Sequence, residues 1–530
     1  MSVGNRFVVA VVFSGLGLLA GCGGGSGVSR PTPPPSGGFT NSSLNGSYTF
    51  SVGGSDSLGI FGMAGTFVAC GCSQGTISSG TVDIINPSGT SSSASLTNKS
   101  TYQMTSDGRG LAKLFIAASG SVAVSEIDLD FVLTSSSHGL VIRYDQNGTG
   151  SGAIDLQSGT LTQTDLTTTP YAFSISGGDL SNLPLSLVGA LTVDASGTIT
   201  TGVEDLNHNG AVTSNLALSG SLTVGSGTSP GQAILTTSSG TLRFSVYAID
   251  ANHLKLIEND GQNVLSGDAF SQPSALFPVG TLVFTMTGLD SSGFLFATVG
   301  AMSSDGNSLI TNGVEDINDG GSVDNNTNPA QPFAFTGTFA GTGGGRFQVT
   351  LSNYVGGSLF AAYPSSAGVL MLEMDPTSGG VTGGIAALQQ SGATLNASQG
   401  YGLNLSGQDL TSGLEIDLLA EFKTTSTQLT GIADQNAAGS IQTANVNGSY
   451  NVANGFGTAT FSSGLPSLFF YPVDSASAFF ITADPTVTAV GSLQMQSAPS
   501  SAAAQTAAKH TSLVPVQRVL PHRARSAHAK

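Results

Sequence analysis

A short motif that occurs four times limits the fold of this chain more than any other feature. Its core is Gly-x-x-Asp followed within three residues by Asn, at Gly80/Asp83, Gly202/Asp205, Gly313/Asp316 and Gly431/Asp434. Successive Asp residues lie 122, 111 and 118 positions apart. A period of this length is too long for a solenoid repeat and matches one small domain. The sequence therefore predicts four tandem modules of one kind.

Two further landmarks recur with the motif and set the predicted module boundaries. Each unit begins with a strand-like segment that contains an aromatic residue, and it ends with a Gln five residues after a Gly. The closing residues are Gln157, Gln272, Gln389 and Gln496. The predicted modules span residues 44–158, 168–274, 279–390 and 398–497. Because short polar or Pro-containing segments join them, we expect a row of beads with a rod-like shape.

Inside each unit the hydrophobic pattern has a period of two. Residues 126–131 and 414–418 alternate strictly between apolar and acidic side chains. Such stretches, separated by turn signals every ten or so residues, are typical of antiparallel strands. We expect an all-β fold of four tandem antiparallel modules, each a small up-and-down barrel or sandwich of seven to eight strands. Sequential hairpins favour the barrel over the sandwich.

The charged residues exclude one class of partner. All 32 acidic residues lie between Asp56 and Asp484, a region with only 8 Lys and Arg residues. An acidic, Lys-poor body does not attract nucleic acid or an anionic membrane surface. We therefore expect no nucleic-acid partner.

The first 22 residues carry an export signal. Arg6 precedes an apolar run over residues 7–20, which is too short to span a bilayer as a helix. Leu19, Ala20, Gly21 and Cys22 end this run and resemble the lipobox of bacterial lipoproteins. The resemblance implies a signal peptide at residues 1–21 and a lipid anchor on Cys22. Because Gly23 rather than Asp follows, it also implies an outer-membrane or cell-surface location rather than the inner membrane.

Low-complexity segments lie at both ends of the predicted modules. Residues 22–43 are rich in Gly, Ser and Pro, which predicts a tether with flexible ends and an extended middle. Residues 498–530 are rich in Ala and Ser and basic, which predicts a disordered tail. This tail either docks on an anionic envelope polymer or on the acidic body of a neighbouring molecule, or it is a solvated extension, and the last hypothesis is favoured.

The motif loops resemble the first half of a calcium-binding loop. The candidate oxygen ligands are Asp205, Asn207 and Asn209 in the second module and Asp316, Asn318 and Asp324 in the third. A loop of the helix–loop–helix kind needs a Glu at its twelfth position, where Leu216 stands. Asp and Asn also stabilise turns through their own backbone, so the turn interpretation is favoured over calcium. We predict no other cofactor.

The cysteine and tyrosine patterns give two further hypotheses. Cys70 and Cys72 are the remaining cysteines and form either a strained disulfide or two incidental thiols. Tyr247, Tyr363 and Tyr471 recur 20 or 21 residues before the closing Gly, with Phe131 at the matching place in the first module. An aromatic residue at the same place in every unit is more typical of a core than of a sugar-binding platform.

These patterns predict a membrane-anchored, exported lipoprotein of the cell envelope that is not an enzyme. It would act in surface display or adhesion, or as a spacer, with a polysaccharide or an envelope protein as its partner. The alternative is a carrier that binds a small ligand or polysaccharide, with the barrel interiors as pockets. An envelope hydrolase is disfavoured because no catalytic constellation recurs. Barrel interiors packed with Leu and Phe would favour display over the carrier.

Overall fold

The computed structural model describes residues 38–117, 125–167, 169–323, 332–376 and 379–497. All of them belong to one compact unit that spans Pro33–Lys530. The predictions on the signal peptide, Cys22, most of the tether, Asp324 and the basic tail fall outside these residues. In the part that the structure describes, no helix is long and apolar enough to cross a membrane.

The predicted all-β fold with tandem antiparallel modules is confirmed. Module 1 contains β1 (Asn45–Asp56), β2 (Gly59–Cys70), β3 (Ile77–Asn86), β4 (Gly89–Ser95), β5 (Thr101–Met104), β6 (Arg109–Ile116), β7 (Ser125–Leu133), β8 (His138–Arg143) and β9 (Gly148–Leu156). Module 2 contains β10 (Tyr171–Asp179), β11 (Pro184–Val193), β12 (Ile199–His208), β13 (Ala211–Ala217), β14 (Ser219–Thr223), β15 (Gly231–Thr237), β16 (Gly240–Asp250), β17 (His253–Glu258) and β18 (Asn263–Ser271).

The other two modules repeat this plan with small differences. Module 3 contains β19 (Gly280–Leu289), β20 (Leu295–Ser304), β21 (Leu309–Asp319), β22 (Ser322–Val323), β23 (Phe333–Gly343), β24 (Arg346–Ser352), β25 (Leu359–Pro364), β26 (Val369–Glu373) and β27 (Val381–Leu388). Module 4 contains β28 (Gly400–Asp409), β29 (Leu414–Thr424), β30 (Gln428–Ala437), β31 (Ser440–Ala453), β32 (Phe456–Ser463), β33 (Leu468–Pro472), β34 (Ser477–Thr482) and β35 (Val487–Met495).

The modules are up-and-down barrels closed to different degrees. In every module the first strand pairs antiparallel with the last, as β1 does with β9. Module 4 is a closed barrel of eight strands, and pairing of β20 with β21 closes module 3. Modules 1 and 2 are nine-stranded sheets, and isolated bridges such as Leu96–Ile116 and Thr198–Ser221 span the gap beside their edge strands.

Each barrel interior is filled by one hydrophobic cluster. The aromatic residues that open the units, Tyr48, Tyr171, Phe284 and Tyr401, lie in these clusters and are at most 1% exposed. The segment before each module adds an apolar side chain to the cluster that follows it. These side chains are Phe39, Leu166, Phe277 and Leu395. The predicted end of the tether at residue 43 is therefore wrong, because Phe39 already belongs to the core of module 1.

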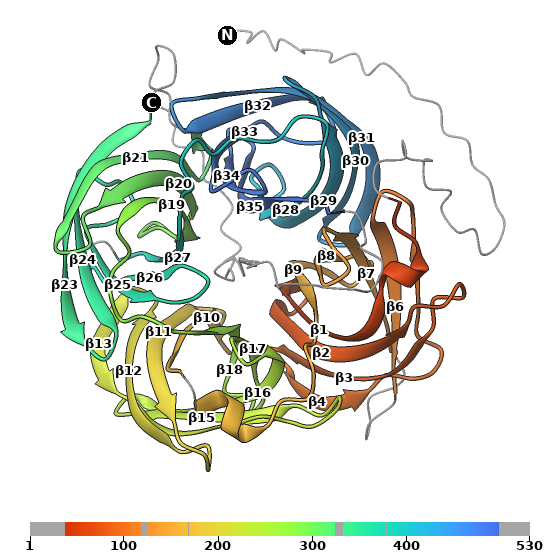
Figure 1. Ribbon diagram of the computed structural model, residues 1–530, viewed down its shortest axis with the longest axis horizontal. Helices are drawn as coiled ribbons and strands as arrows, with labels where there is room; N and C mark the ends of the chain where they lie inside the picture. The colour runs from red at the N-terminus through yellow and green to blue at the C-terminus, as the bar shows by residue number, and fades with distance from the viewer. Residues whose placement is uncertain (1–37, 118–124, 168, 324–331, 377–378, 498–530) are drawn as a thin grey trace, which may run out of the picture. The chain divides into compact units, whose positions relative to one another are not determined.

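The four modules form a closed ring, as Figure 1 shows. Each module places its second and third strands against the last strands of the next, for example β2 and β3 against β17 and β18. A similar arrangement joins module 4 to module 1, where the first two strands of module 4, β28 and β29, pack on β8 and β9. The expected row of beads is therefore wrong. A period read from sequence gives the number of modules but not the angle between them.

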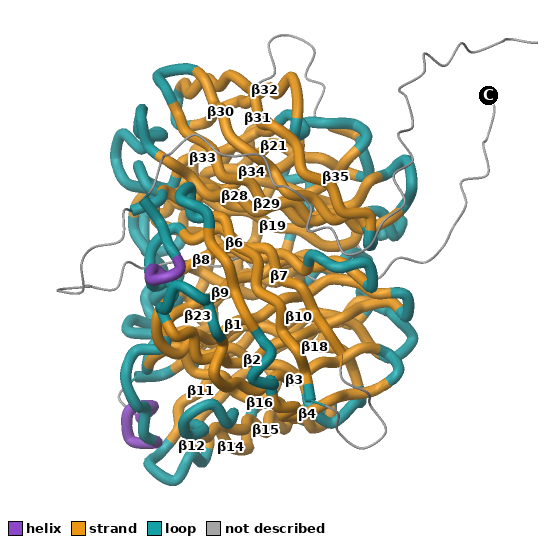
Figure 2. Tube along the Cα trace, turned by 90° about the vertical axis from the view of Figure 1, so that its right-hand side faces the viewer, coloured by secondary structure: helices purple, strands orange, loops and turns teal. Residues whose placement is uncertain are grey.

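The ring has two different ends, defined by the strand directions. Because the first and last strands of a module are antiparallel, each module is entered and left at the same end, which we call the linker end. The opposite end, where the turn at residues 57–58 joins β1 to β2, is called the tip end. Figure 2 shows the two 3-10 helices before modules 1 and 2, η1 (Asn41–Ser43) and η2 (Gln163–Thr167), on the same side of the ring.

Candidate functional site

The repeated Asp of every module is buried at the joint with the next module. In three joints a tyrosine hydroxyl of the next module donates to it, as Tyr247 to Asp83 at 2.9 Å, Tyr363 to Asp205 at 2.5 Å and Tyr471 to Asp316 at 2.7 Å. In the fourth joint Arg109 of module 1 donates to Asp434 of module 4 at 3.0 Å. The Asp of the repeated motif therefore forms a buried hydrogen bond between neighbouring modules at every joint.

Asp205 accepts hydrogen bonds from two residues besides the tyrosine. Nε and Nη2 of Arg346 lie 2.7 and 2.8 Å from its two oxygens, and the amide of Asn215 adds a bond of 2.9 Å. Burial, and then the adjacent carboxylate, raises the pKa of Tyr363, so this tyrosine remains a donor at physiological pH. Hydrogen bonds to a charged partner are among the stronger ones in proteins, and these lie in a buried interface.

The Asn two residues after the Asp reaches into the same neighbour. Nδ2 of Asn207 donates to the carbonyls of Glu373 and Gly380 in module 3 at 2.9 and 3.0 Å. Asn318 and Asn436 donate in the same way to carbonyls of modules 4 and 1. In module 1 the position is Ile85, which packs with Tyr247 in an apolar cluster instead.

The closing Gln completes each joint. Gln157, Gln272, Gln389 and Gln496 donate to the backbone carbonyls of Ala248, Pro364, Pro472 and Leu133, at 2.8, 2.9, 2.7 and 3.0 Å. In modules 2, 3 and 4 the residue just before the carbonyl that accepts from Gln is the joint tyrosine, Tyr247, Tyr363 or Tyr471. In module 1 the residue at that place is Val132. Module 1 therefore has Val132 at the tyrosine position, and the predicted match of Phe131 is wrong by one residue. Phe131 faces the core of its own barrel, whereas Val132 packs against Leu419 of module 4.

These contacts give the candidate calcium ligands other partners. Both oxygens of Asp205 already accept from Arg346, and Asn207 and Asn318 donate their amide hydrogens to the next module. Asn209 is an exposed turn residue with a φ of 51°. Among the described residues no group of three His, Cys, Asp or Glu side chains is placed to hold a metal ion. A cation at Asp205 would have to displace the guanidinium group of Arg346.

The two cysteines lie at the linker end of module 1. A disulfide joins Cys70 to Cys72, with their Cα atoms 5.1 Å apart. Tyr102 donates to the carbonyls of Asn41 and Leu44 beside it, and accepts from the amide of Gly71. The disulfide therefore belongs to the local packing of the turn that follows β2.

A cluster of charged side chains lies within the joint between modules 1 and 2. Nζ of Lys255 lies 3.2 Å from Asp268 and 3.7 Å from Asp155 of module 1. His138 bonds to Asp155 at 2.6 Å and His253 to Asp268 at 2.7 Å. Burial alone would raise the pKa of Asp155, but His138 and Lys255 hold it below its usual range. Lys255 is fully buried, so this cluster joins the modules and does not offer an open catalytic site.

Comparison with known proteins does not assign the chain to a family. No protein-family profile matches it, and no curated protein matches its sequence.

Several solved structures share a weak similarity with the chain. They include a tryptophan-to-alanine mutant of the vaccine antigen transferrin binding protein B from Haemophilus parasuis, with 10% identity over 86% of this chain and 95% of that one, at a TM-score of 0.18. The intact Ap-TbpB, with N and C lobes, has 9% identity over the same shares and the same TM-score of 0.18. The isotype 1 protein from serogroup B Neisseria meningitidis has 11% identity over 67% and 84%, at a TM-score of 0.15. At these TM-scores the similarity supports no argument about function.

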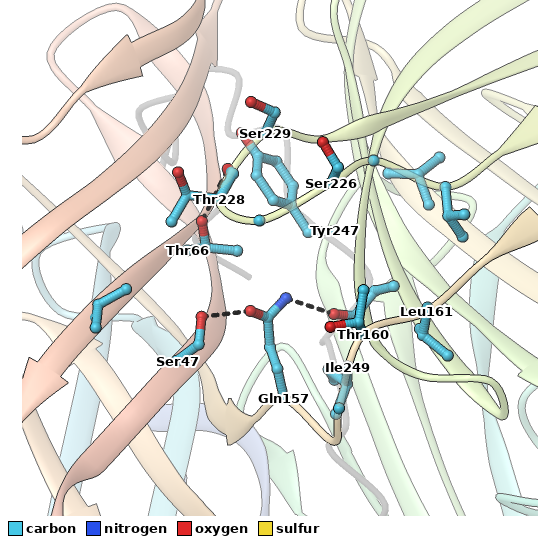
Figure 3. A pocket seen from close by; sticks show the side chains of 17 residues that line it. Ser47, Thr66, Gln157, Thr160, Leu161, Ser226, Thr228, Ser229, Tyr247 and Ile249 are labelled. Atoms are coloured by element: carbon cyan, nitrogen blue, oxygen red, sulfur yellow. Dashed lines mark hydrogen bonds between the residues drawn. The ribbon is translucent and has the colours of Figure 1, made fainter.

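A pocket of about 380 Å³ opens between modules 1 and 2 at the linker end. Figure 3 shows Gln157 at its centre, bonded to Ser47 at 2.5 Å and to the carbonyl of Ala248. Thr66 donates to the carbonyl of Thr228 on the opposite wall at 3.0 Å. These polar groups already bond to one another across the joint, so the pocket offers a ligand few open donors or acceptors.

A larger cavity, about 1060 Å³, lies at the tip end and is called the tip cavity. It is lined by residues of all four modules, chiefly from the turns that join β1 to β2, β8 to β9, β28 to β29 and β34 to β35. Asn182 of module 2 and Phe294 and Gly320 of module 3 complete its wall. No sequence pattern predicts this cavity, because it forms only where four separate modules close a ring.

Proposed function

We propose that this protein is an exported lipoprotein, held in the cell envelope by acyl chains on Cys22. Its ring of β modules serves as a non-enzymatic body for display and binding. The lipobox-like residues 19–22 support the anchor. Each methylene of an inserted acyl chain adds about 0.8 kcal/mol to membrane affinity, so more than one chain makes the attachment durable.

One geometric observation carries the proposal. The chain enters the ring at the linker end, where Asn45 begins β1, and the tip cavity lies at the opposite end. A body tethered through its N-terminal segment therefore presents the tip end away from the membrane. This is the arrangement that a displayed binding surface requires.

The packing of the modules supports display over the carrier hypothesis. Clusters of Leu, Phe and Tyr fill the four barrel interiors, which leaves the predicted pockets inside the barrels no space. The cavities described above lie between modules instead. Binding of a polysaccharide remains the second candidate function, and the tip cavity is the observation that favours it.

Two measurements test the proposed anchor. We expect mass spectrometry of the mature protein to find acyl chains on Cys22, and we expect Cys22→Ser to release the protein from membranes. An unacylated mature terminus at another residue would contradict the anchor.

Epitope tags test the orientation of the ring. One tag is inserted after Ser412 in an exposed tip turn, and a matched control tag after Gly392 in an exposed linker-end segment. On intact cells we expect an antibody to bind the tip tag more strongly than the control. Equal access, or access only after cell lysis, would contradict display of the tip end.

A further inference from the structure

The tip cavity combines hydrogen-bonding groups with exposed apolar side chains. Gln146 and Asn147 bring side-chain amides to its wall, and Ser57 and Thr411 bring hydroxyl groups. The side chains of Gln408, Ser412 and Thr486 also line it and donate to Gly413, Asp409 and Asp484, which leaves their oxygens to accept from a ligand. Among them stand Leu58, Phe294 and Leu414, which are 50%, 45% and 42% exposed. Apolar walls with a few oriented polar groups are typical of small-molecule sites, and the volume lies near the upper end of their usual range.

The charges around the cavity select against anionic ligands. Asp56 and Glu415 are the acidic side chains among its described lining residues, which include no Lys, Arg or His. The guanidinium group of Arg143 lies beneath the wall at Gly148, where it is bonded to Asp145 at 3.0 Å and stacked on Phe61. An anion would therefore meet two carboxylates and no available cation.

The polar groups also select against a purely apolar ligand. A hydrocarbon chain that filled the cavity would remove water from amides and hydroxyls without replacing their hydrogen bonds, at a cost of about 1–3 kcal/mol for each buried group. A sugar chain satisfies both demands, because its hydroxyls pair with amides and hydroxyls and its C–H faces pack on side chains such as Phe294.

We propose that the tip cavity binds a neutral oligosaccharide, in contact with all four modules at once. This inference rests on the proposed function, because it names the ligand class of the displayed end. Closure of the ring is then a condition for binding, since no single module contains the site.

Isothermal titration of the acylated full chain, held in a sugar-free detergent, tests the inference. The probes are maltohexaose, cellohexaose, mannohexaose and xylohexaose, with hexagalacturonate as the anionic counterpart. We expect at least one neutral probe to bind and hexagalacturonate to bind at least tenfold more weakly.

Variants locate the site. We expect Phe294→Ala combined with Leu414→Ala to weaken binding of the neutral probe at least tenfold. The matched control combines Leu276→Ala with Val279→Ala, two residues that are 75% and 68% exposed in the linker-end segment before module 3, and leaves binding unchanged. All four residues are exposed, so the variants retain the fold.

Three outcomes would overturn the inference. They are no binding of any neutral probe, tighter binding of hexagalacturonate, or equal affinity of the tip-cavity and control variants. Acylation of Cys22 is measured separately, so loss of the anchor and loss of sugar binding are distinguishable results.

Discussion

The guanidinium group of Arg109 donates to the carboxylate of Asp434 across 3.0 Å, although 325 residues separate them in the chain. Both side chains are fully buried, and Arg109 also contacts Asp107 at 2.8 Å. In the other three joints a tyrosine donates to the repeated Asp, whereas in this joint Val132 holds the tyrosine position and Arg109 is the donor. The ion pair joins module 4 to module 1 and closes the ring.

Loss of Asp434 should weaken this closure. Asp434→Asn removes one carboxylate partner of the buried Arg109, and breaking a buried ion pair typically costs about 3–5 kcal/mol. We expect a corresponding fall in the free energy of unfolding in urea, together with faster hydrogen exchange in β29 and β30. Tyr144→Phe, which removes longer contacts at the rim of the same joint, is the control. Equal effects of the two variants would show that the ion pair does not hold the ring closed.

The glycine that ends the motif should be required for stability only where it contacts the next module. Gly321 has a φ of 87°, and a Cβ there would lie 2.4 Å from the carbonyl oxygen of Pro485 in module 4. Gly89, its counterpart in module 1, has a φ of 137°, and a Cβ there would meet no heavy atom within 4 Å. Both Ala variants carry backbone strain, but only Gly321→Ala also disturbs a joint. We therefore expect Gly321→Ala to lower the free energy of unfolding by roughly 1–3 kcal/mol more than Gly89→Ala does. Thermal unfolding of both variants measures the difference, and equal melting temperatures would refute it.

Stability should fall as pH rises from about 4.5 to 7. Burial, and then the Asp205 carboxylate, raises the pKa of Glu204 from 4.5 to about 7. The folded chain therefore holds this proton more tightly than the unfolded chain. The resulting stabilisation is complete below pH 4.5 and is lost as pH rises through the pKa that Glu204 has in the folded chain. The total loss in the free energy of unfolding is about 3 kcal/mol at most.

Urea denaturation of Glu204→Gln across this pH range isolates the contribution of Glu204, because the amide cannot ionise. We expect the variant to lose less stability than the natural protein between pH 4.5 and 7. Parallel curves for the two proteins would contradict the assignment to Glu204.

Calcium should not change the stability of the protein through Asp205, because Arg346 and Tyr363 already occupy its oxygens. We expect calcium added to the chelator-treated protein to leave its melting temperature unchanged, with magnesium as the control. A rise with calcium that Asp205→Asn abolishes would show that the ion competes successfully with Arg346.

Local patterns were sufficient to predict the strands and the number of modules. The alternation at residues 126–131 predicted β7, and the spacing of Asp83, Asp205 and Asp316 predicted repeated units. The same Asp residues were interpreted as turn or calcium residues, since nothing beside them in sequence indicates a tyrosine of the next module. Counting back from the closing Gly aligned Phe131 with the tyrosines, but the structural register assigns that place to Val132.

The sequence by itself determined that this protein is built of four β modules, because side-chain periodicity reports which face of a strand is buried. Only the tertiary structure decided that the modules close into a ring, which residues hold each joint, and where a cavity shared by all four lies. These features depend on pairs such as Tyr247 and Asp83, which are 164 residues apart. Their contact follows from the angle at which two folded barrels pack, and no local pattern encodes that angle.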